Sequence, residues 1–400
     1  MIQESLFGEP KIEIQTEGIK YAGSKLKLLP DILGIIGLLP AKTVWDPFSG
    51  TTRVSQALSK SGYNVISSDR AEWSKVFATC YLMNEKEPSY YQDLIDHLNN
   101  LTPISGWFTE NYGSDKPFSE CGVKRPWQSK NTRKLDAIRE EIDKLDLSEI
   151  DKSVALTSLI LALDKVDSTL GHFVSYLKDW SPRSYNDLFL TVPRIWQNTA
   201  SRNRVLCGDV FDLTKSVTAD VAYLDPPYGS NNEKMPPSRV RYASYYHIWT
   251  TICLNDQPDL FGKANRRKDT SDVVSGSIFE EFRKDSDGNF IAVKAIERLI
   301  KEVNSRWVVL SYSSGGRATA QELVKALSDN GDIKLVKEID YKKNVMAEMK
   351  WTNEWLRKIE EPHKEFLFLL DKGKVPRQNK IVSTKMDYPE TMKQKAAVAC

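Results

Sequence analysis

Residues 221 to 228 read VAYLDPPY, an apolar stretch that ends in an acid, two prolines and a tyrosine. Proline has no N–H donor and a fixed φ angle, so Pro226 and Pro227 end the predicted strand and stiffen the turn that follows. Asp225 and Tyr228 are therefore presented on a rigid corner. A carboxylate there can accept hydrogen bonds and an aromatic ring can stack on a flat ligand. The structural alternative is a tight turn with Tyr228 packed in the core.

Four predicted strands end in aspartate, at Asp46, Asp69, Asp209 and Asp225. In open α/β sheets the ligand lies beyond the carboxyl ends of the strands, so all four acids are expected to face one crevice. The alternative for each of them is a helix cap, because aspartate is a preferred residue at that position. Four such acids together favour a binding site.

The apolar pattern predicts the elements that position these acids. Segment 43–50 is a short strand that breaks into a Ser-Gly turn, 54–62 is an amphipathic helix and 63–69 is a second strand. This βαβ unit predicts a parallel, doubly wound sheet. The remaining predicted elements are a helix at 25–40, strands at 204–209, 221–225 and 307–314, and an antiparallel pair at 334–343 and 365–373.

The bulk composition restricts the class of protein. A net charge of +2 over 400 residues means that any surface for nucleic acid must be local. The five cysteines are scattered and suggest no metal site, so no metal is expected. No apolar stretch approaches the roughly 20 residues that span a bilayer, which predicts a soluble, intracellular protein without a membrane partner.

The middle of the chain differs from its two flanks in its sequence pattern. Residues 88–203 contain amphipathic helices, one of which carries Leu135, Ile138, Ile142 and Leu145 on a single face. The segment is too long to be a connection and predicts a separate, mostly helical lobe. The expected domains are a catalytic domain of 1–87 and 204–372, the lobe of 88–203, and a polar tail of 373–400.

The turn after the first strand indicates the kind of cofactor. Phe48-Ser49-Gly50 lacks the GxGxxG sequence of nicotinamide folds and the GK[ST] ending of nucleotide triphosphatases. Asp69 ends the second strand, where acids hold ribose hydroxyls in doubly wound folds. Adenosine without a pyrophosphate remains, which points to S-adenosyl-L-methionine. A purely structural turn is the alternative.

Four stretches in fixed order resemble the motifs of Dam-like (N6-adenine)-specific DNA methyltransferases. They are IKYAGSKLKLL (19–29), WDPFSGTTRVS (45–55), VISSDR (65–70) and YLDPPY (223–228). The resemblance covers most of 19–370 in layout. It implies a Rossmann-like methyltransferase sheet with an inserted target-recognition domain, and methyl transfer to an adenine flipped out of double-stranded DNA. Two alternatives remain, a cytosine N4 DNA methyltransferase and a non-catalytic DNA-binding protein on the same fold.

The resemblance also implies partners and cofactor ligands. A cognate restriction endonuclease is a candidate partner, and the expected location is the cytoplasm of a bacterial or phage-infected cell. Thr52 and Ser24 stand where the family usually has glycine, which bears on how closely the backbone approaches the methionine tail. The residues expected to line the cofactor are Tyr21, Lys25, Asp46, Phe48, Gly50, Asp69, Asp209 and Asp225.

The catalytic residues implied are Asp225, Pro226, Pro227 and Tyr228. An exocyclic amino group is a poor nucleophile because its lone pair is delocalised, and Asp225 with a corner carbonyl can accept both of its hydrogens. Tyr228 would stack on the extruded base. Asp225 is expected to keep an ordinary pKa near 4. Secondary candidates are Tyr245, Tyr246 and His247, for which helix packing is the alternative.

Basic residues mixed with aromatic ones indicate where DNA would bind. Between 116 and 134 there are six basic residues against one acid, with two aromatic rings among them. Phosphate contact and base-edge readout need such a mixture. Further basic loops lie at 177–186 and 263–268, and a solvated loop is the alternative for each. The predicted DNA contacts are Lys124, Arg125, Lys130, Arg133, Lys178, Arg183, Arg266 and Arg267.

Overall fold

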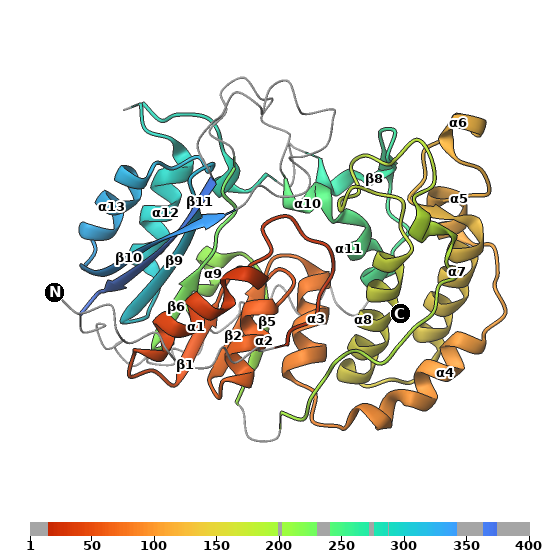
Figure 1. Ribbon diagram of the computed structural model, residues 1–400, viewed down its shortest axis with the longest axis horizontal. Helices are drawn as coiled ribbons and strands as arrows, with labels where there is room; N and C mark the ends of the chain where they lie inside the picture. The colour runs from red at the N-terminus through yellow and green to blue at the C-terminus, as the bar shows by residue number, and fades with distance from the viewer. Residues whose placement is uncertain are drawn as a thin grey trace, which may run out of the picture.

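The computed structural model describes residues 15–198, 202–229, 241–271, 276–286, 288–341 and 363–373 (Figure 1). Except for residue 373, the predicted polar tail lies outside these ranges. No helix within them is long and apolar enough to cross a membrane.

The centre of the fold is a seven-stranded sheet of order β10-β11-β9-β6-β1-β2-β5. Neighbouring strands from β9 to β5 pair in parallel, whereas β11 is antiparallel to both β9 and β10. The predicted doubly wound α/β fold and its antiparallel pair are confirmed. The strands are β1 (Thr43–Asp46), β2 (Asn64–Asp69), β5 (Arg204–Cys207), β6 (Val221–Leu224), β9 (Trp307–Ser313), β10 (Asp332–Tyr341) and β11 (His363–Asp371).

Helices cover both faces of the sheet because successive strand residues point to opposite faces. Val44 of β1 packs into one core with α1, α2 and α3, and the adjacent Trp45 packs into the other core with α9, α12 and α13. Both side chains are fully buried. The helices are α1 (Leu29–Gly37), α2 (Arg53–Lys60), α3 (Glu72–Leu82), α9 (Val210–Leu213), α12 (Ile291–Glu302) and α13 (Ala320–Ser328).

The helix predicted at 25–40 is shorter than expected. It begins with a 3-10 turn, η1 (Leu26–Leu28), and continues as α1, where Pro30 occupies the first turn. Proline is tolerated there because the first N–H groups of a helix have no partner within it. Leu39 and Pro40 already lie beyond its end.

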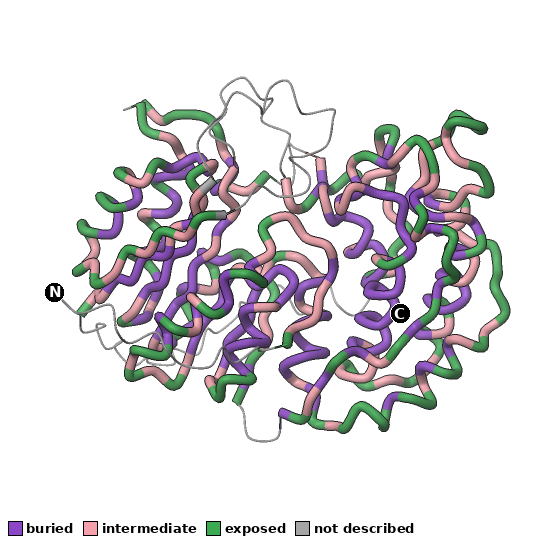
Figure 2. The backbone as a smooth tube through the Cα atoms, viewed as in Figure 1, coloured by how far each residue is buried: buried purple, intermediate pink, exposed green. Residues whose placement is uncertain are grey.

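The middle of the chain forms a helical lobe beside the sheet (Figure 1). Figure 2 shows that α8 is buried along most of its length. Leu135, Ile138 and Ile142 of α7 are buried in the lobe core as the pattern predicted, and Leu145 follows the end of that helix. The helices are α4 (Gln92–Asn100), α5 (Trp107–Tyr112), α6 (Phe118–Cys121), α7 (Ser129–Lys144) and α8 (Glu149–Lys165).

A later segment also packs on the lobe core. Trp249 of α11 contacts Phe173 at 4.7 Å between ring centroids, and the Arg139 guanidinium donates to the Ile252 carbonyl at 2.6 Å. From the sequence, this segment is predicted to belong to the catalytic domain of 1–87 and 204–372. It comprises α10 (Tyr242–Tyr245), α11 (His247–Leu254), β7 (Leu260–Phe261) and β8 (Arg266–Arg267).

The remaining short elements lie mostly in connections. They are η2 (Pro88–Tyr91), β3 (Gly113–Ser114), β4 (Trp127–Gln128), η3 (Pro182–Tyr185), η5 (Lys268–Thr270) and η6 (Ile278–Glu280).

Asp220 ties together the starts of the two central strands. Its Oδ2 accepts hydrogen bonds from the backbone N–H groups of Lys42 and Thr43, each at 2.8 Å, and from the Thr43 hydroxyl at 2.9 Å. Partial burial alone would raise the pKa of Asp220, but these donors outweigh burial and lower it. The contacts align β1 with β6, the strands that carry Asp46 and Asp225.

We expect Asp220→Asn to lower the free energy of unfolding by about 1 kcal/mol at pH 7, because the charged acceptor is lost and the site is half exposed. The pKa of the folded protein lies below that of the unfolded chain. The contribution is therefore present above pH of about 4 and is lost as the pH falls through the folded pKa. Urea unfolding of both proteins from pH 7 to pH 3 measures this; a difference that does not narrow at low pH would contradict it.

Candidate active site

The direction of the chain connections reverses at β1. The strands β2 and β5 lie on one side of it, and β6 and β9 lie on the other. Ligands in doubly wound sheets bind at such a switch point, beyond the carboxyl ends of the strands. A hollow is found at this place. It is lined by Tyr21, Gly23, Ser24, Lys25, Asp46, Phe48, Ser49, Gly50, Thr51, Arg53, Val54, Tyr223 and Asp225.

Asp225 stands at the end of β6 and faces two partners. Its Oδ1 accepts a hydrogen bond from the Tyr228 hydroxyl at 2.6 Å and lies 3.1 Å from the Lys25 ammonium. Burial raises the pKa of Asp225, and Lys25 and Tyr228 offset that effect only in part. The pKa is therefore not the ordinary one expected, because the sequence could not show that neighbouring side chains shield this corner from water. A partly buried carboxylate is a stronger acceptor than an exposed one.

Tyr228 is held on several sides. Its ring lies 4.6 Å from the Tyr312 ring, and the Lys25 ammonium lies 4.7 Å from its centroid. Its carbonyl accepts from the Arg317 N–H at 2.7 Å and from the Tyr312 hydroxyl at 3.1 Å. Contacts to both the side chain and the carbonyl of Tyr228 therefore fix the corner that includes Pro226 and Pro227.

The glycine turn after β1 is built around Asp69. The Gly50 N–H donates to Asp69 Oδ2 at 2.9 Å, and Oδ1 accepts from the Ala71 N–H at 2.9 Å. Gly50 has a φ of 47°, and a Cβ there would lie 3.2 Å from the Tyr21 hydroxyl. Glycine therefore suits both the backbone and the space. Burial raises the pKa of Asp69.

Thr52 adopts a backbone conformation that favours glycine. Its φ is 62°, its side chain is fully buried, and its Oγ1 accepts from the Gln56 amide at 2.9 Å. A β-branched residue in the left-handed region is an uncommon, strained state. Thr52 stands where the family usually has glycine, and the backbone nevertheless keeps the left-handed turn there.

Asp46 is the most deeply buried acid of the hollow, with an exposed fraction of 1%. Its Oδ2 accepts from the Ser55 hydroxyl at 2.7 Å, whereas its Oδ1 has no hydrogen-bond partner among the residues that the structure describes. Burial, reinforced by the charges of Asp225 and Asp69, raises the pKa of Asp46 to about 7. A buried acceptor of this kind suits an N–H donor or a cation supplied by a ligand.

Aromatic residues connect the hollow to the lobe. Tyr21 stacks on Tyr246 at 4.6 Å, and the Tyr246 hydroxyl accepts from the Ala22 N–H at 2.7 Å. Tyr245 instead stacks on His172, away from the residues that line the hollow. Phe48 lines the hollow and packs edge-on against Phe279.

Two other predicted residues lie elsewhere. His247 is fully buried in the lobe core, where one ring nitrogen contacts the Phe173 carbonyl at 3.2 Å and burial lowers its pKa to about 3. It is therefore not suited to act as a base in the hollow. Asp209 is exposed and caps α9 by accepting from the Phe211 N–H at 2.9 Å. This is the helix-cap alternative left open for it.

Glu365 is an acid of the corner that the sequence analysis missed. It is 8% exposed, and its Oε2 lies 3.4 Å from the Tyr228 hydroxyl. Burial raises its pKa. The acids predicted from the sequence all follow the carboxyl ends of strands, whereas β11 is antiparallel to β9 and brings its amino end to the same edge. An acid at the start of the apolar run EFLFLL was the available signal.

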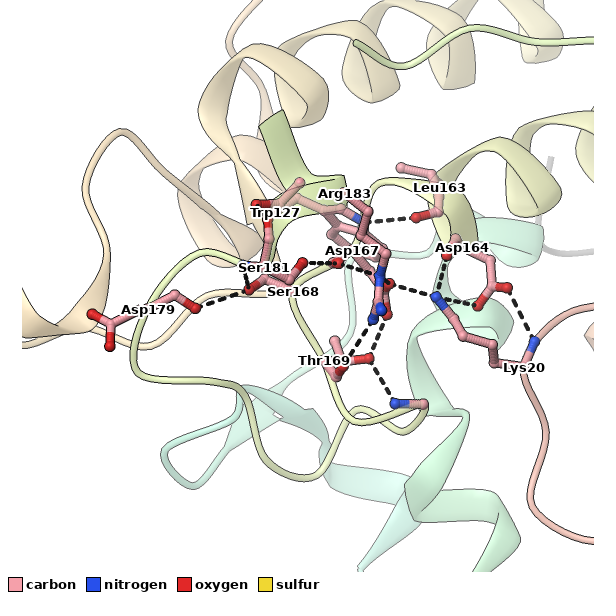
Figure 3. A network of polar contacts seen from close by, with 12 residues as sticks. Lys20, Trp127, Leu163, Asp164, Asp167, Ser168, Thr169, Asp179, Ser181 and Arg183 are labelled. Atoms are coloured by element: carbon pink, nitrogen blue, oxygen red, sulfur yellow. Dashed lines mark hydrogen bonds and ion pairs between the residues drawn. The ribbon is translucent and has the colours of Figure 1, made fainter. Parts of the chain in front are cut away.

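Arg183 is engaged within the lobe. It donates to the Asp167 carboxylate at 2.7 Å and to the Thr169 carbonyl at 2.8 Å. Asp167 is fully buried and also pairs with Lys20 at 2.7 Å (Figure 3). The Lys20 backbone N–H donates to Asp164 at 3.0 Å. This network fixes the segment before Tyr21 to the lobe.

Arg267 is also engaged within the protein. It is 4% exposed and makes two hydrogen bonds each to the carboxylates of Asp256 and Asp269, with a fifth to the Thr251 hydroxyl at 3.4 Å. These contacts use every donor of the guanidinium. The DNA contact predicted for Arg267 is therefore corrected to a structural role.

The other predicted DNA contacts lie on or near the lobe surface. Lys130 pairs with Asp187 at 2.6 Å, and Arg133 lies 3.8 Å from Asp115. Burial lowers the pKa of the half-buried Arg125. The Lys124 ammonium lies over the Phe118 ring, the Arg266 guanidinium lies over the Phe261 ring, and Lys178 is exposed.

The sheet order, the hollow at its switch point and the Asp-Pro-Pro-Tyr corner define a Rossmann-like methyltransferase. The family model of the D12 class N6 adenine-specific DNA methyltransferases matches residues 21–287, and the chain belongs to this family. Among the residues that the structure describes, no group of three or more His, Cys, Asp or Glu side chains is arranged to hold a metal ion.

Curated relatives are similar over most of the chain. Modification methylase StsI of Streptococcus sanguinis is 28% identical over 81% of this chain and 48% of its own length. The type II methyltransferase M.FokI of Planomicrobium okeanokoites is 28% identical over 78% and 47%. The chain thus spans about half the length of these two. The type II methyltransferase M.NlaIII of Neisseria lactamica is 25% identical over 80% of this chain and 90% of its own length.

We expect Asp167→Ala to lower the free energy of unfolding by about 3 kcal/mol, because two cations at the buried junction lose their shared partner. The exposed pair of Asp187 and Lys130 supplies the control. Asp187→Asn should stay within about 1 kcal/mol of the wild type, because exposed pairs contribute little. Denaturant unfolding compares the three proteins, and equal stability of all three would contradict a structural role for Asp167.

Proposed function

We propose that this chain is a site-specific DNA adenine N6-methyltransferase that uses S-adenosyl-L-methionine. One observation carries the proposal: the Asp225 carboxylate and the Tyr228 ring stand on a fixed corner beside an acid-lined hollow at the switch point. The family is adenine-specific, and the relatives are named modification methylases. A cognate restriction endonuclease is therefore the partner that we propose.

The residues of the hollow fit the proposed cofactor. Asp46 offers an unpaired buried oxygen to the amino group of the methionine tail, and Gly50 leaves room beside Tyr21. The acids Asp46 and Asp225 line the hollow, and the charge of Asp69 acts on Asp46, so this place favours a cationic ligand. When bound there, S-adenosyl-L-methionine supplies a methyl group activated by a positively charged sulfur.

The corner prepares the amino group that receives the methyl. Asp225 and a backbone carbonyl of the Pro226-Pro227 corner would accept two N–H donors, which favours a localised lone pair on the nitrogen. Lys25 favours the ionised form of Asp225, while partial burial makes the carboxylate a stronger acceptor. The remaining requirement is alignment of the nitrogen with the methyl group, which a rigid corner provides.

The target base must leave the duplex to reach this corner. A base within the helix is inaccessible, so the proposal requires base flipping, with Tyr228 contacting the extruded ring. The lobe would hold the duplex beside the hollow. The Ser119 hydroxyl donates to Asp179 at 2.6 Å, which brings α6 next to the loop that carries Lys178. We propose Lys124 and Lys178 as phosphate contacts on this side of the lobe.

The reaction is tested with tritiated S-adenosyl-L-methionine and mixed-sequence duplex DNA. We expect the label in N6-methyladenine, and we expect Asp225→Ala to reduce transfer by on the order of 10² to 10³-fold, because one fixed acceptor is removed. Analysis of the digested nucleosides identifies the product.

Each other result decides against part of the proposal. Label only in N4-methylcytosine would show that the target base is cytosine and not adenine. DNA binding without any transfer would favour the non-catalytic alternative, and undiminished turnover of the Asp225 variant would remove that residue from the mechanism.

DNA contact is tested by charge reversal. We expect Lys124→Glu with Lys178→Glu to weaken duplex binding and to reduce the slope of log K against log salt by about 2, because two phosphate contacts are lost. The control is Lys325→Glu. Lys325 is an exposed residue of α13, a helix beside the end of the sheet that is far from the lobe (Figure 1). Affinities measured from 50 to 200 mM salt give the two slopes. Equal effects of the double variant and the control would contradict the assignment.

A further inference from the structure

A second carboxylate lies behind the corner. Glu365 lies near the start of β11, at the catalytic edge of the sheet, and is 8% exposed. In β11 it pairs with Ser313 of β9 and Ile339 of β10, so its position is fixed by the sheet on both sides. Burying an acid is unfavourable unless it has a partner or a function. The acid therefore requires an explanation beyond folding.

The Tyr228 hydroxyl stands between two carboxylates. It lies 2.6 Å from Asp225 Oδ1 and 3.4 Å from Glu365 Oε2, with the Ser311 hydroxyl at 3.3 Å. A phenol has a single hydrogen to donate, and the shorter distance assigns it to Asp225. If Asp225 became protonated, it would donate to the phenol oxygen instead. The phenol hydrogen would then be available to Glu365.

The proposed reaction creates a proton that must leave the corner. The methyl carbon forms a bond to the amino nitrogen and loses its bond to sulfur, which keeps the electron pair. The nitrogen is left positively charged with two hydrogens, and loss of one as a proton gives the neutral methylamino product. Asp225 is the adjacent acceptor, but it must lose that proton before it can prepare another amino group.

We propose that Glu365 receives this proton through the Tyr228 hydroxyl. The inference rests on the proposed function. One hydrogen passes from the nitrogen to Asp225, then from Asp225 to the phenol oxygen, while the phenol hydrogen passes to Glu365. Asp225 returns to the carboxylate form, Tyr228 is unchanged, and Glu365 becomes a neutral acid. Glu365 then releases the proton to solvent and returns to the carboxylate form. Glu365 acts through another residue and never touches the base.

The surrounding charges favour this direction. Lys25 lies 3.1 Å from Asp225 and opposes its protonation, so the proton is held less firmly there. Burial raises the pKa of Glu365, and the charge of Asp225 adds to this effect, while Lys25 and Tyr228 oppose it. Among the described residues, the other titratable side chains coupled to Glu365 are the buried Tyr223 and the half-buried Tyr242, and burial raises the pKa of both tyrosines.

The test follows methyl transfer and proton release in the same turnover. The substrate is a duplex oligonucleotide with the site mapped by methylation-sensitive sequencing, mixed with enzyme and S-adenosyl-L-methionine in weak buffer with a pH indicator. In the wild type we expect both signals at one rate. In Glu365→Gln we expect methyl transfer within about threefold, but proton release slower by on the order of 10²-fold.

Three further variants separate a relay from a role in folding or charge balance. Tyr228→Phe keeps the ring and removes the relay oxygen, so proton release should lag by a similar factor, and the double variant should lag no further. Glu365→Asp keeps the acid and should lag less. The control is Glu338→Gln, an exposed acid of the adjacent β10 that pairs with Lys364.

Proton release that keeps pace with methyl transfer in Glu365→Gln would overturn the relay, as would an equal loss of both signals. Absence of N6-methyladenine with the wild-type protein would instead contradict the proposed function. The two failures are therefore distinguishable.

Discussion

The parallel pairing of β1 with β6 is the constraint on which the site depends. These strands are far apart in the sequence, yet their register sets Val44 against Val221 and Trp45 against Ala222. Asp46 and Asp225 consequently lie at the same edge of the sheet, with Asp225 two residues further along its strand. Asp220 fixes the opposite, amino ends of the same two strands.

Burial of several acids in one place is the second consequence of this alignment. Asp46, Asp69, Asp225 and Glu365 all have raised pKa values, with burial as the largest cause for each. Lys25 is the cation that pairs with Asp225 within the described site. Such an arrangement is unfavourable for folding alone and is typical of a place that binds a cation or moves protons.

The lobe is connected to the hollow through the N-terminal segment. Tyr21 stacks on Tyr246, and Lys20 pairs with the buried Asp167 beneath the lobe helices. Only the short stretch from Lys20 to Lys25 lies between that ion pair and the catalytic corner. The contacts thus give the cofactor loop and the lobe a shared structural support.

The sequence by itself determined the order of the strands along the chain, the inserted helical lobe and the Asp-Pro-Pro-Tyr corner, because these depend on local apolar patterns and on the backbone limits of proline. It also led to the family through short motifs. Only the tertiary structure decided which charged side chains are buried together. Arg183 and Arg267 are of the residue type expected at a DNA contact, but carboxylates of the protein itself bind their guanidinium groups. Glu365 reaches the corner because β11 runs antiparallel, a property of strand pairing that no local pattern contains.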